Sequence, residues 1–188
     1  SSDFAITSPT DQPAAPLQLS DAAQSKFEEF SHAVPLALFD YLRKSGARGF
    51  VLSLSGGADS AACAVLVGLM ARYAMGELGR ADADSPEAAV RCLLTTVYQA
   101  TRNSSGTTRD AAAAIAAAVG AEHHAWSVDE LVAGYTDRVA TAIGRELTWD
   151  TDDITLQNIQ SRARSPGVWM LANLKNALLL TTGNRSEA

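Results

Sequence analysis

The sequence is poor in cysteine, in aromatic residues and in long apolar runs. Its 188 residues include two cysteines, Cys63 and Cys92, each within an apolar stretch. Two such thiols exclude a disulfide framework and a cysteine-rich zinc site, and we expect both to be buried free thiols in a reducing compartment. No apolar run has the length of a membrane span, and the N-terminus shows no signal-peptide or transit-peptide pattern. These absences predict a cytoplasmic protein with no membrane partner.

Basic residues are also in the minority. Lys and Arg number 15 against 21 Asp and Glu, which gives a formal net charge of −6. A broad nucleic-acid footprint needs a basic face, so we expect no nucleic-acid partner, although a single nucleotide needs only a few local cations. We expect no histidine metal site, because His123 and His124 are neighbours on one expected strand and point to opposite faces.

The residues that are present suit one globular domain. An apolar fraction of 47% over this length is enough for an α/β domain with a full core. Residues 1–20 combine three prolines with Ser, Thr, Asp and Gln, which is typical of a linker or disordered tail. We therefore assign residues 21–188 to a single domain.

Four short apolar runs alternate with longer stretches of helical periodicity. The expected strands are 50–54, 91–97, 122–126 and 177–181. The expected helices are 21–45, 58–76, 108–119, 128–143 and 153–173. Proline should divide or kink two of these helices, at Pro35 and at Pro166, and Thr107 or Thr108 should cap the third. Segments 77–85 and 98–106 are expected to be surface loops.

This alternation predicts a doubly wound parallel sheet between two helical layers, a three-layer αβα fold. Right-handed crossovers gather the loops at the carboxyl ends of the strands, where ligands of such folds bind. We expect the strand order 3-2-1-4. The loop after the first strand then lies at the switch point between strands 1 and 4.

That loop, Ser53-Leu-Ser-Gly-Gly-Ala-Asp-Ser60, is the most informative stretch of the chain. It follows an apolar strand and opens a helix, whose N-terminus offers unpaired N–H groups and partial positive charge to an anion. Gly56 and Gly57 leave room for a phosphate against the backbone, and Ser55 and Ser60 add hydroxyl donors. The alternative interpretation is a glycine-rich turn that binds no ligand.

Asp59 is the unusual member of the loop, because a carboxylate repels a phosphate. Its position makes sense if a divalent cation lies between them, and Mg²⁺ is held by carboxylates and phosphates in this way. The loop is not a Walker P-loop, since G-x-x-x-x-G-K-[ST] is absent. It resembles the S-G-G-x-D-S loop of the ATP pyrophosphatases, which split ATP between its α and β phosphates.

Two later stretches also carry polar side chains. On a helix, Asn158 and Arg162 lie one turn apart on one face, although for these residues alone a solvated charged helix is the favoured interpretation. The segment 181–187 follows the fourth expected strand, at the same end of the sheet as the first loop. There Thr182 can donate to a nucleotide and Glu187 can supply a second carboxylate to Mg²⁺.

Together, Ser-Gly-Gly-Ala-Asp-Ser, Asn-Ile-Gln-Ser-Arg-Ala-Arg and Leu-Leu-Thr-Thr-Gly-Asn-Arg-Ser-Glu-Ala resemble the motifs of NAD synthetase. The chain is most similar to the synthetase domain of the glutamine-dependent form. The resemblance covers about residues 25–188 and is specific, because other ATP pyrophosphatases do not share the later two motifs. It implies an adenine nucleotide alpha hydrolase-like fold.

The resemblance also implies site residues. Those implied to bind ATP are Ser53, Leu54, Ser55, Gly56, Gly57, Ala58, Asp59, Ser60 and Thr182. Those implied to be catalytic are Asp59, Ser55 and Ser60. Those implied to hold Mg²⁺ are Asp59 and Glu187. Those implied to contact deamido-NAD, the nicotinate adenine dinucleotide, are Asn158, Arg162 and Glu187.

The implied reaction is ATP-dependent amidation. The nicotinate carboxylate attacks the α-phosphorus of ATP, pyrophosphate leaves, and ammonia converts the adenylate into NAD and AMP. Ammonia would be free or come from glutamine through a glutaminase domain, and a homodimer or higher homo-oligomer is the implied assembly. The nucleophile is already ionised, so catalysis should depend on positioning and on charge stabilisation.

Two alternatives stay open. One is another ATP pyrophosphatase, such as GMP synthetase or a tRNA-modifying enzyme, and the other is a non-enzymatic nucleotide-binding domain. The sequence also departs from the family pattern at Pro166-Gly167, where some members have an unbroken helix, which leaves the position of Arg164 open. The family continues past Ala188 with further elements, so we expect the domain to be C-terminally incomplete.

Overall fold

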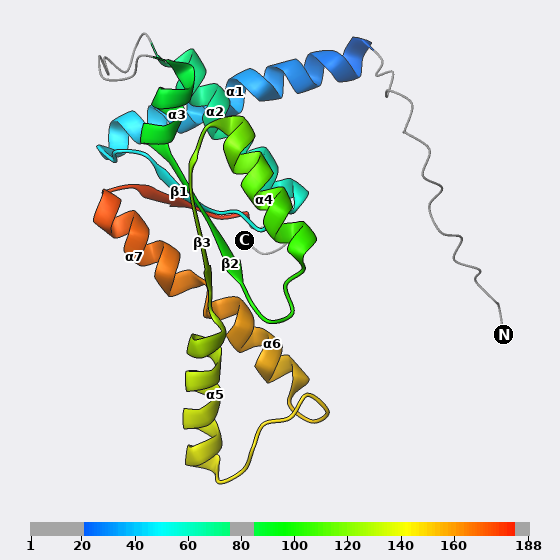
Figure 1. Ribbon diagram of the computed structural model, residues 1–188. Helices are drawn as coiled ribbons and strands as arrows, with labels where there is room; N and C mark the ends of the chain where they lie inside the picture. The colour runs from blue at the N-terminus through cyan, green and yellow to red at the C-terminus, as the bar shows by residue number, and fades with distance from the viewer. Residues whose placement is uncertain (1–20, 76–84, 183–188) are drawn as a thin grey trace, which may run out of the picture.

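A computed structural model describes residues 21–75 and 85–182 (Figure 1). Residues 1–20, 76–84 and 183–188 lie outside that description. The expected N-terminal tail, almost all of the expected loop 77–85 and the predicted metal ligand Glu187 fall in these segments.

A four-stranded parallel sheet forms the centre, in the order β3-β2-β1-β4. Its strands are β1 (Phe50–Ser53), β2 (Leu94–Ala100), β3 (Glu122–Ser127) and β4 (Leu178–Leu180). In β1, Val51 lies opposite Thr95 of β2 and opposite Leu179 of β4. The predicted order 3-2-1-4 is confirmed, and the loop after β1 lies at the switch point.

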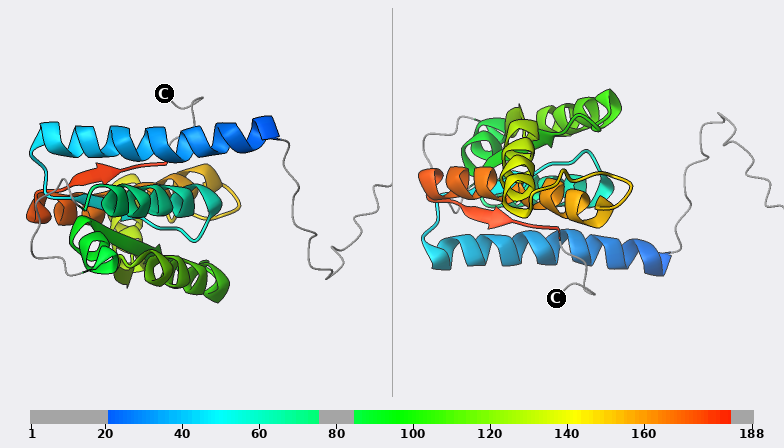
Figure 2. Two further views of the ribbon diagram at one scale, coloured as in Figure 1. Left: turned by 90° about the horizontal axis from the view of Figure 1, so that it is seen from above. Right: turned by 90° about the horizontal axis from the view of Figure 1, so that it is seen from below.

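Helices cover both faces of the sheet. They are α1 (Asp21–Ser45), α2 (Ala58–Tyr73), α3 (Pro86–Leu93), α4 (Gly106–Val119), α5 (Asp129–Ile143), α6 (Asp153–Arg162) and α7 (Ser165–Lys175). The helices α1, α2 and α4 lie on one face and α7 lies on the other, as the αβα prediction requires (Figure 2). By contrast, α5 and α6 extend past the carboxyl ends of the strands (Figure 1). No helix in the described ranges is long and apolar enough to span a membrane.

Two apolar clusters attach the helices to the sheet. The larger cluster packs Leu52 of β1 with Met70 of α2 on one face. The smaller cluster packs Val51 and Val97 against Val168 of α7 on the other face. Val51 and Leu52 are both fully buried, because a strand alternates its side chains between two covered faces. This is why β1 appears in the sequence as a continuous apolar run.

The expected strand 91–97 is wrong at its beginning. Its first three residues form the last turn of α3, and β2 begins at Leu94. The helix forms because Ser85 caps it, its Oγ accepting from the N–H of Ala88 at 3.2 Å. Pro86 occupies the first turn, where the missing N–H has no helical partner to lose.

This shift changes two further predictions. Both thiols are free, but Cys92 is exposed on α3, so the expectation that it is buried is wrong, and Cys63 is half-buried. The same shift extends β2 to Ala100. Tyr98 and Gln99, which we expected in a loop, are therefore buried strand residues.

Neither proline divides a helix in its interior. The helix α1 continues through Pro35 as a single helix, and the proline is buried. Pro166 lies in the first turn of α7, where proline is tolerated, and the interruption comes earlier, at Ala163 and Arg164.

One helix cap differs from expectation, and one helix begins without a capping bond. Helix α4 is capped by Ser105, whose Oγ accepts from the N–H of Thr108 at 3.2 Å, so the prediction of a cap at Thr107 or Thr108 is wrong. At α6, Asp152 makes no capping bond. Its carboxylate instead accepts from both terminal nitrogens of Arg145, at 2.8 and 2.7 Å.

Candidate active site

The loop Ser53–Ser60 is held in a tight turn by its own hydroxyl groups. Ser55 Oγ lies 3.1 Å from Ser60 Oγ and accepts from the N–H of Gly57 at 3.3 Å. Ser60 Oγ donates to the carbonyl oxygen of Gly57 at 3.0 Å and accepts from the N–H of Ser55 at 3.3 Å. The buried Ser60 hydroxyl is thus occupied within the loop, whereas Ser55 is exposed and available to a ligand.

The two glycines of the loop have different reasons to be glycine. Gly56 has φ +83°, and a Cβ there would lie 2.3 Å from the carbonyl oxygen of Thr108 in α4. Both the conformation and the close approach exclude a side chain. Gly57 has an extended conformation with φ −89°, and its Cβ would meet only Ser55 Oγ at 3.4 Å. Its missing side chain instead leaves the mouth of the loop open.

Helix α2 begins without a side-chain cap. Gly57 is its N-cap residue, and the first helical bond runs from the N–H of Ala61 to the carbonyl oxygen of Gly57. The amides of residues 58–60 precede that bond, so they are the unpaired donors of a helix N-terminus and can bind an anion. Asp59 is exposed in this first turn.

Cys63 lies one turn beyond Asp59. Burial raises the pKa of the Cys63 thiol, and the nearby negative charge of Asp59 raises it further. The thiol is therefore protonated at neutral pH and is no nucleophile. This agrees with the prediction that the cysteine serves packing.

Two cavities flank the loop at the carboxyl edge of the sheet. The larger, of about 700 Å³, is lined by Ser53, Ser55, Ser161, Arg164, Ser165, Val168, Trp169, Leu179, Leu180, Thr181 and Thr182. The smaller, of about 190 Å³, is lined by Ser53, Leu54, Ser55, Tyr98, Gln99, Ser104, Thr108 and Arg164. Both cavities include Ser53, Ser55 and Arg164, so a ligand at the loop has space on either side.

Arg164 is the cation that the structure brings to this loop. It lies between α6 and α7, and its Nε donates to the carbonyl oxygen of Gln99 at 3.3 Å. The sequence left its position open because the break in the helix was assigned to Pro166. The actual break, one turn before Val168, directs Arg164 toward the ends of β1 and β2. We did not predict Arg164 or Gln99 as site residues.

The predicted pair on α6 has the expected spacing. Arg162 Nη1 donates to Asn158 Oδ1 at 2.8 Å, and both side chains are exposed. Leu156 and Ala163 are buried on the opposite side. Neither Asn158 nor Arg162 is among the residues that line the two cavities, so their contact with a dinucleotide stays a prediction.

Thr182 lies where the sequence placed it, at the same edge as the loop. It is exposed and lines the larger cavity together with Ser55. Glu187 lies outside the described residues. Among those residues, no group of three or more His, Cys, Asp and Glu side chains could form a metal cage. A lone exposed carboxylate at Asp59 instead suits Mg²⁺ that keeps its waters and shares the ligand's phosphates.

Comparison with known proteins gives an independent result. A family model described as NAD synthase matches residues 31–188. The chain belongs to the NAD synthase family. The matched range contains the loop 53–60, helix α6 and the stretch 181–187, which are the three segments that carry the sequence resemblance.

Curated relatives are similar over most of this chain. The Rhodobacter capsulatus glutamine-dependent NAD(+) synthetase is 36% identical over 166 residues, which are 88% of this chain and 26% of the relative. The Arabidopsis thaliana enzyme of the same name is 33% identical over 172 residues, covering 78% of this chain and 24% of the relative. The chain thus spans about a quarter of the length of these NAD synthase relatives.

Solved structures agree with the fold. A glutamine-dependent NAD(+) synthetase from Cytophaga hutchinsonii superposes with a TM-score of 0.80 at 46% identity, covering 86% of this chain and 32% of that chain. The Acinetobacter baumannii enzyme, solved in complex with ADP, has a TM-score of 0.67 at 24% identity, covering 94% of this chain and 28% of that chain. At that identity the second likeness supports the fold alone.

Proposed function

We propose that this domain carries out the ATP-dependent amidation of deamido-NAD to NAD, with release of AMP and pyrophosphate. The proposal rests on the geometry of the loop 53–60 in a chain that belongs to the NAD synthase family. The loop is a rigid glycine turn that ends in unpaired helix amides, lies at the switch point of the sheet and opens into a cavity on each side. An ATP-dependent adenylation needs such a phosphate site between two substrate spaces.

In this proposal the residues of the loop have different roles. The amides of 58–60 and the Ser55 hydroxyl would bind the β and γ phosphates, which become the leaving pyrophosphate. Ser60 would keep the loop in shape through its three internal hydrogen bonds. The guanidinium of Arg164 would add positive charge beside the α phosphate.

Asp59 would hold Mg²⁺ together with the phosphates, with Glu187 as a second carboxylate, and that ion would offset the charge of the leaving group. No general base is required, because the attacking nicotinate is a carboxylate that is ionised at neutral pH. The protein's task is to align this carboxylate with the α-phosphorus. The larger cavity would hold the dinucleotide, with Thr182 toward ATP and the Asn158–Arg162 pair at its outer edge.

The decisive experiment measures pyrophosphate release from ATP by the full-length protein. Release should require deamido-NAD, and addition of ammonium should give NAD and AMP. Asp59→Asn should lower the rate by several orders of magnitude at unchanged stability, since a metal ligand is worth several kcal/mol in the transition state. Asp137→Asn, which changes another exposed carboxylate, on α5, is the matched control.

The two alternatives give different outcomes in the same assay. Another ATP pyrophosphatase would release pyrophosphate only with a different acceptor, and a non-enzymatic domain would bind ATP without release. Near-parental release by the Asp59 variant would remove that residue from the mechanism while leaving the reaction in place.

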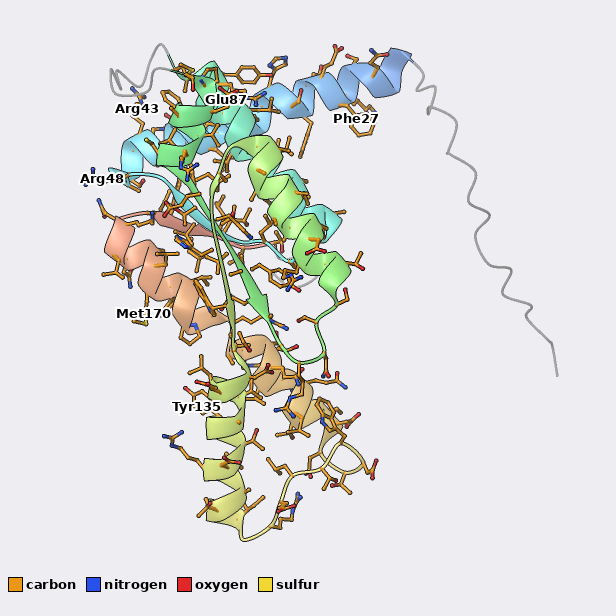
Figure 3. The ribbon with its side chains drawn as sticks, in the orientation of Figure 1. Phe27, Arg43, Arg48, Glu87, Tyr135 and Met170 are labelled. Carbon is orange, nitrogen blue, oxygen red and sulfur yellow. The ribbon has the colours of Figure 1, made fainter. Side chains whose placement is uncertain are left out.

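An assembly is the second part of the proposal. Helix α5 carries Leu131, Tyr135, Val139 and Ile143 at four-residue intervals, each between 46% and 51% exposed. Tyr135 and Met170 of the neighbouring α7 both point away from the body of the domain (Figure 3). Such a stripe is typical of an association surface, and we assign it to a homodimer or higher homo-oligomer.

Sedimentation of the protein tests this assignment. Val139→Asp on the stripe should dissociate the oligomer, whereas Ala133→Asp on the opposite side of α5 should not. A monomeric parent protein would contradict the assignment. The apolar stripe on α5 would then be expected to contact another domain of the same chain.

The remaining assignments follow from the same family. Residues 21–188 would form the synthetase domain, and residues 1–20 would be a linker. The relatives are named for glutamine dependence, which supports a glutaminase domain as the source of ammonia in the complete protein. ATP, deamido-NAD and ammonia are the proposed small-molecule partners, and the cytoplasm is the proposed location.

A further inference from the structure

A further cavity lies at the opposite edge of the sheet from the loop after β1. It has a volume of about 420 Å³ and is lined at the beginning of every strand, by Phe50, Thr95, Glu122 and Ala177. The last turns of α3 and α7 also line it, because each of these helices ends close to the beginning of a strand. The proposed reaction makes no use of this space.

The charged side chains of this cavity are mainly basic. Arg48, Arg91 and Lys175 line it, and Glu122 is the one carboxylate among its described lining residues. The whole chain has a formal net charge of −6, so three cations around one cavity depart from its general charge. Arg48 belongs to the edge of the domain where α1 ends and β1 begins (Figure 3).

The carboxylate of Glu122 is already compensated within the protein. It accepts from the Lys175 ammonium, from Thr95 Oγ1 at 3.2 Å and from His124 Nε2 at 3.0 Å. The hydrogen bond from Lys175 lowers the pKa of Glu122, so the carboxylate is ionised at neutral pH and holds the lysine at the cavity. Arg91, by contrast, makes no hydrogen bond or ion pair among the described residues.

The ordinary interpretation of Arg91 and Lys175 is that they offset the negative ends of α3 and α7. Main-chain donors, however, already satisfy carbonyl oxygens at both ends. In α3 the N–H of Leu94 closes the last turn, and in α7 the N–H of Ala177 donates to the carbonyl oxygen of Ala172 at 2.8 Å. The guanidinium of Arg91 is therefore not needed as a capping donor and can bind a ligand.

We propose that this cavity binds a phosphate group, either as inorganic phosphate or as part of a small phosphate ester. Arg48 and Arg91 bind its oxygens through their guanidinium groups, and Lys175 adds a third positive charge. A phosphate has nearly two negative charges and three or more acceptor oxygens, which suits cations that come from three separate elements. At about 420 Å³ the cavity also has room for the organic part of a small ester.

Cys92 provides a local reporter of binding, because its free thiol is exposed and lines the same cavity. The full-length protein is treated with N-ethylmaleimide, which is uncharged, and modification of Cys92 is followed by mass spectrometry. Inorganic phosphate should slow this modification in a saturable manner, by about tenfold at ten times its Kd, relative to chloride at the same ionic strength. ATP and Mg²⁺ are present throughout, and the rate at Cys63, one turn beyond Asp59, should not change.

A matched pair of variants tests the cavity itself. Arg91→Gln should raise the Kd of phosphate about tenfold, because it removes a charged hydrogen-bond donor. Arg43→Gln removes a positive charge at the same edge of the domain, but Arg43 pairs with Asp40 and does not line the cavity (Figure 3). It should leave the Kd within about twofold. The Kd comes from the phosphate dependence of the Cys92 rate, so a changed intrinsic reactivity of the thiol does not affect it.

The source of the phosphate is identified by repeating the titration with glycerol 3-phosphate. A lower Kd for this ester than for inorganic phosphate indicates that the cavity takes a phosphorylated metabolite. An equal or higher Kd indicates free phosphate.

Three outcomes would overturn the inference. A Cys92 rate that phosphate leaves unchanged excludes binding in the cavity. Equal weakening in Arg91→Gln and Arg43→Gln shows that the positive charge of the edge attracts the ion without a defined site. A Cys92 that reacts only after unfolding shows that another part of the full-length chain covers the cavity. These measurements follow one thiol at the amino edge of the sheet, so they do not depend on the proposed reaction.

Discussion

Helices α2 and α5 each follow a parallel strand and are nearly equal in length, with 16 and 15 residues, yet they are held in different ways. In α2 six residues are buried, including Val67 and Met70 in the main core. In α5 no residue is buried, although the helix has an apolar stripe. A crossover helix normally covers the sheet, and α5 instead leaves it at the carboxyl edge.

The difference in burial suggests that one part of the domain determines its stability and another part surrounds the candidate site. The side of α1, α2 and α4 contains most of the buried apolar residues, so it should determine the free energy of unfolding. In the extension formed by α5 and α6 few apolar residues are buried, such as Leu156, and the pair Arg145–Asp152 joins the end of one helix to the start of the other. The extension frames the site and leaves the apolar stripe of α5 exposed. Elements with few buried contacts are the ones that open first.

The largest expected effect compares two leucines, one on each side. Leu52→Ala in β1 should lower the free energy of unfolding by about 2–5 kcal/mol, because it leaves a cavity in a fully buried position. Leu131→Ala in α5, which is 51% exposed, should change it by less than about 0.5 kcal/mol. Urea denaturation at low protein concentration measures both. Similar losses would mean that α5 is as firmly packed as the core.

The next effect compares the two loop glycines. Gly56→Ala should cost at least about 1–2 kcal/mol of stability, because it forces a left-handed conformation and a contact with the Thr108 carbonyl. Gly57→Ala should cost much less, and its methyl group should mainly hinder phosphate binding. Thermal unfolding and ATP titration of the two variants separate these effects. A stable Gly56 variant would contradict the geometry of the turn.

A smaller effect is expected from two arginines near the junction of α6 and α7, Arg162 and Arg164. Arg164→Ala should weaken ATP about tenfold, because the side chain lines both cavities beside the loop. Arg162→Ala should leave ATP within about twofold and weaken deamido-NAD instead. Both ligands are titrated into both variants. Equal losses for the two ligands in Arg162→Ala, or none, would make that residue part of a solvated face.

The smallest effect concerns the ion pair between Arg145 and Asp152, which joins the end of α5 to the start of α6. The hydrogen-bonded Arg145 guanidinium holds the pKa of Asp152 well below its usual range. The folded-state pKa is thus lower than the unfolded one, so the stability from this carboxylate is present above about pH 4 and is lost as the pH falls toward the lowered value. Asp152→Asn should lower the urea midpoint at pH 7, and the difference from the parent should shrink at pH 3. Asp150→Asn, an exposed neighbour, should show no such pH-dependent difference.

Sequence patterns predicted correctly those elements whose apolar periodicity or turn residues match their final place in the fold. The apolar run of β1, the turn at Gly56 and the helix after it were expected within a few residues. The pair Asn158–Arg162 was expected from helical spacing. The start of β2 was not predicted, because Leu93 and Leu94 belong to one apolar run. In the structure this run is divided between the last turn of α3, a helix that begins at the Ser85 cap, and the first residue of β2.

The sequence by itself determined the alternation of strands and helices, the glycine turn after β1 and the family, because these depend on short-range periodicity and on residues that adjoin in the chain. Only the tertiary structure decided which polar residues meet at the loop. Gln99 and Arg164 are 65 residues apart and come together because parallel strands end at one edge and α7 packs back across it.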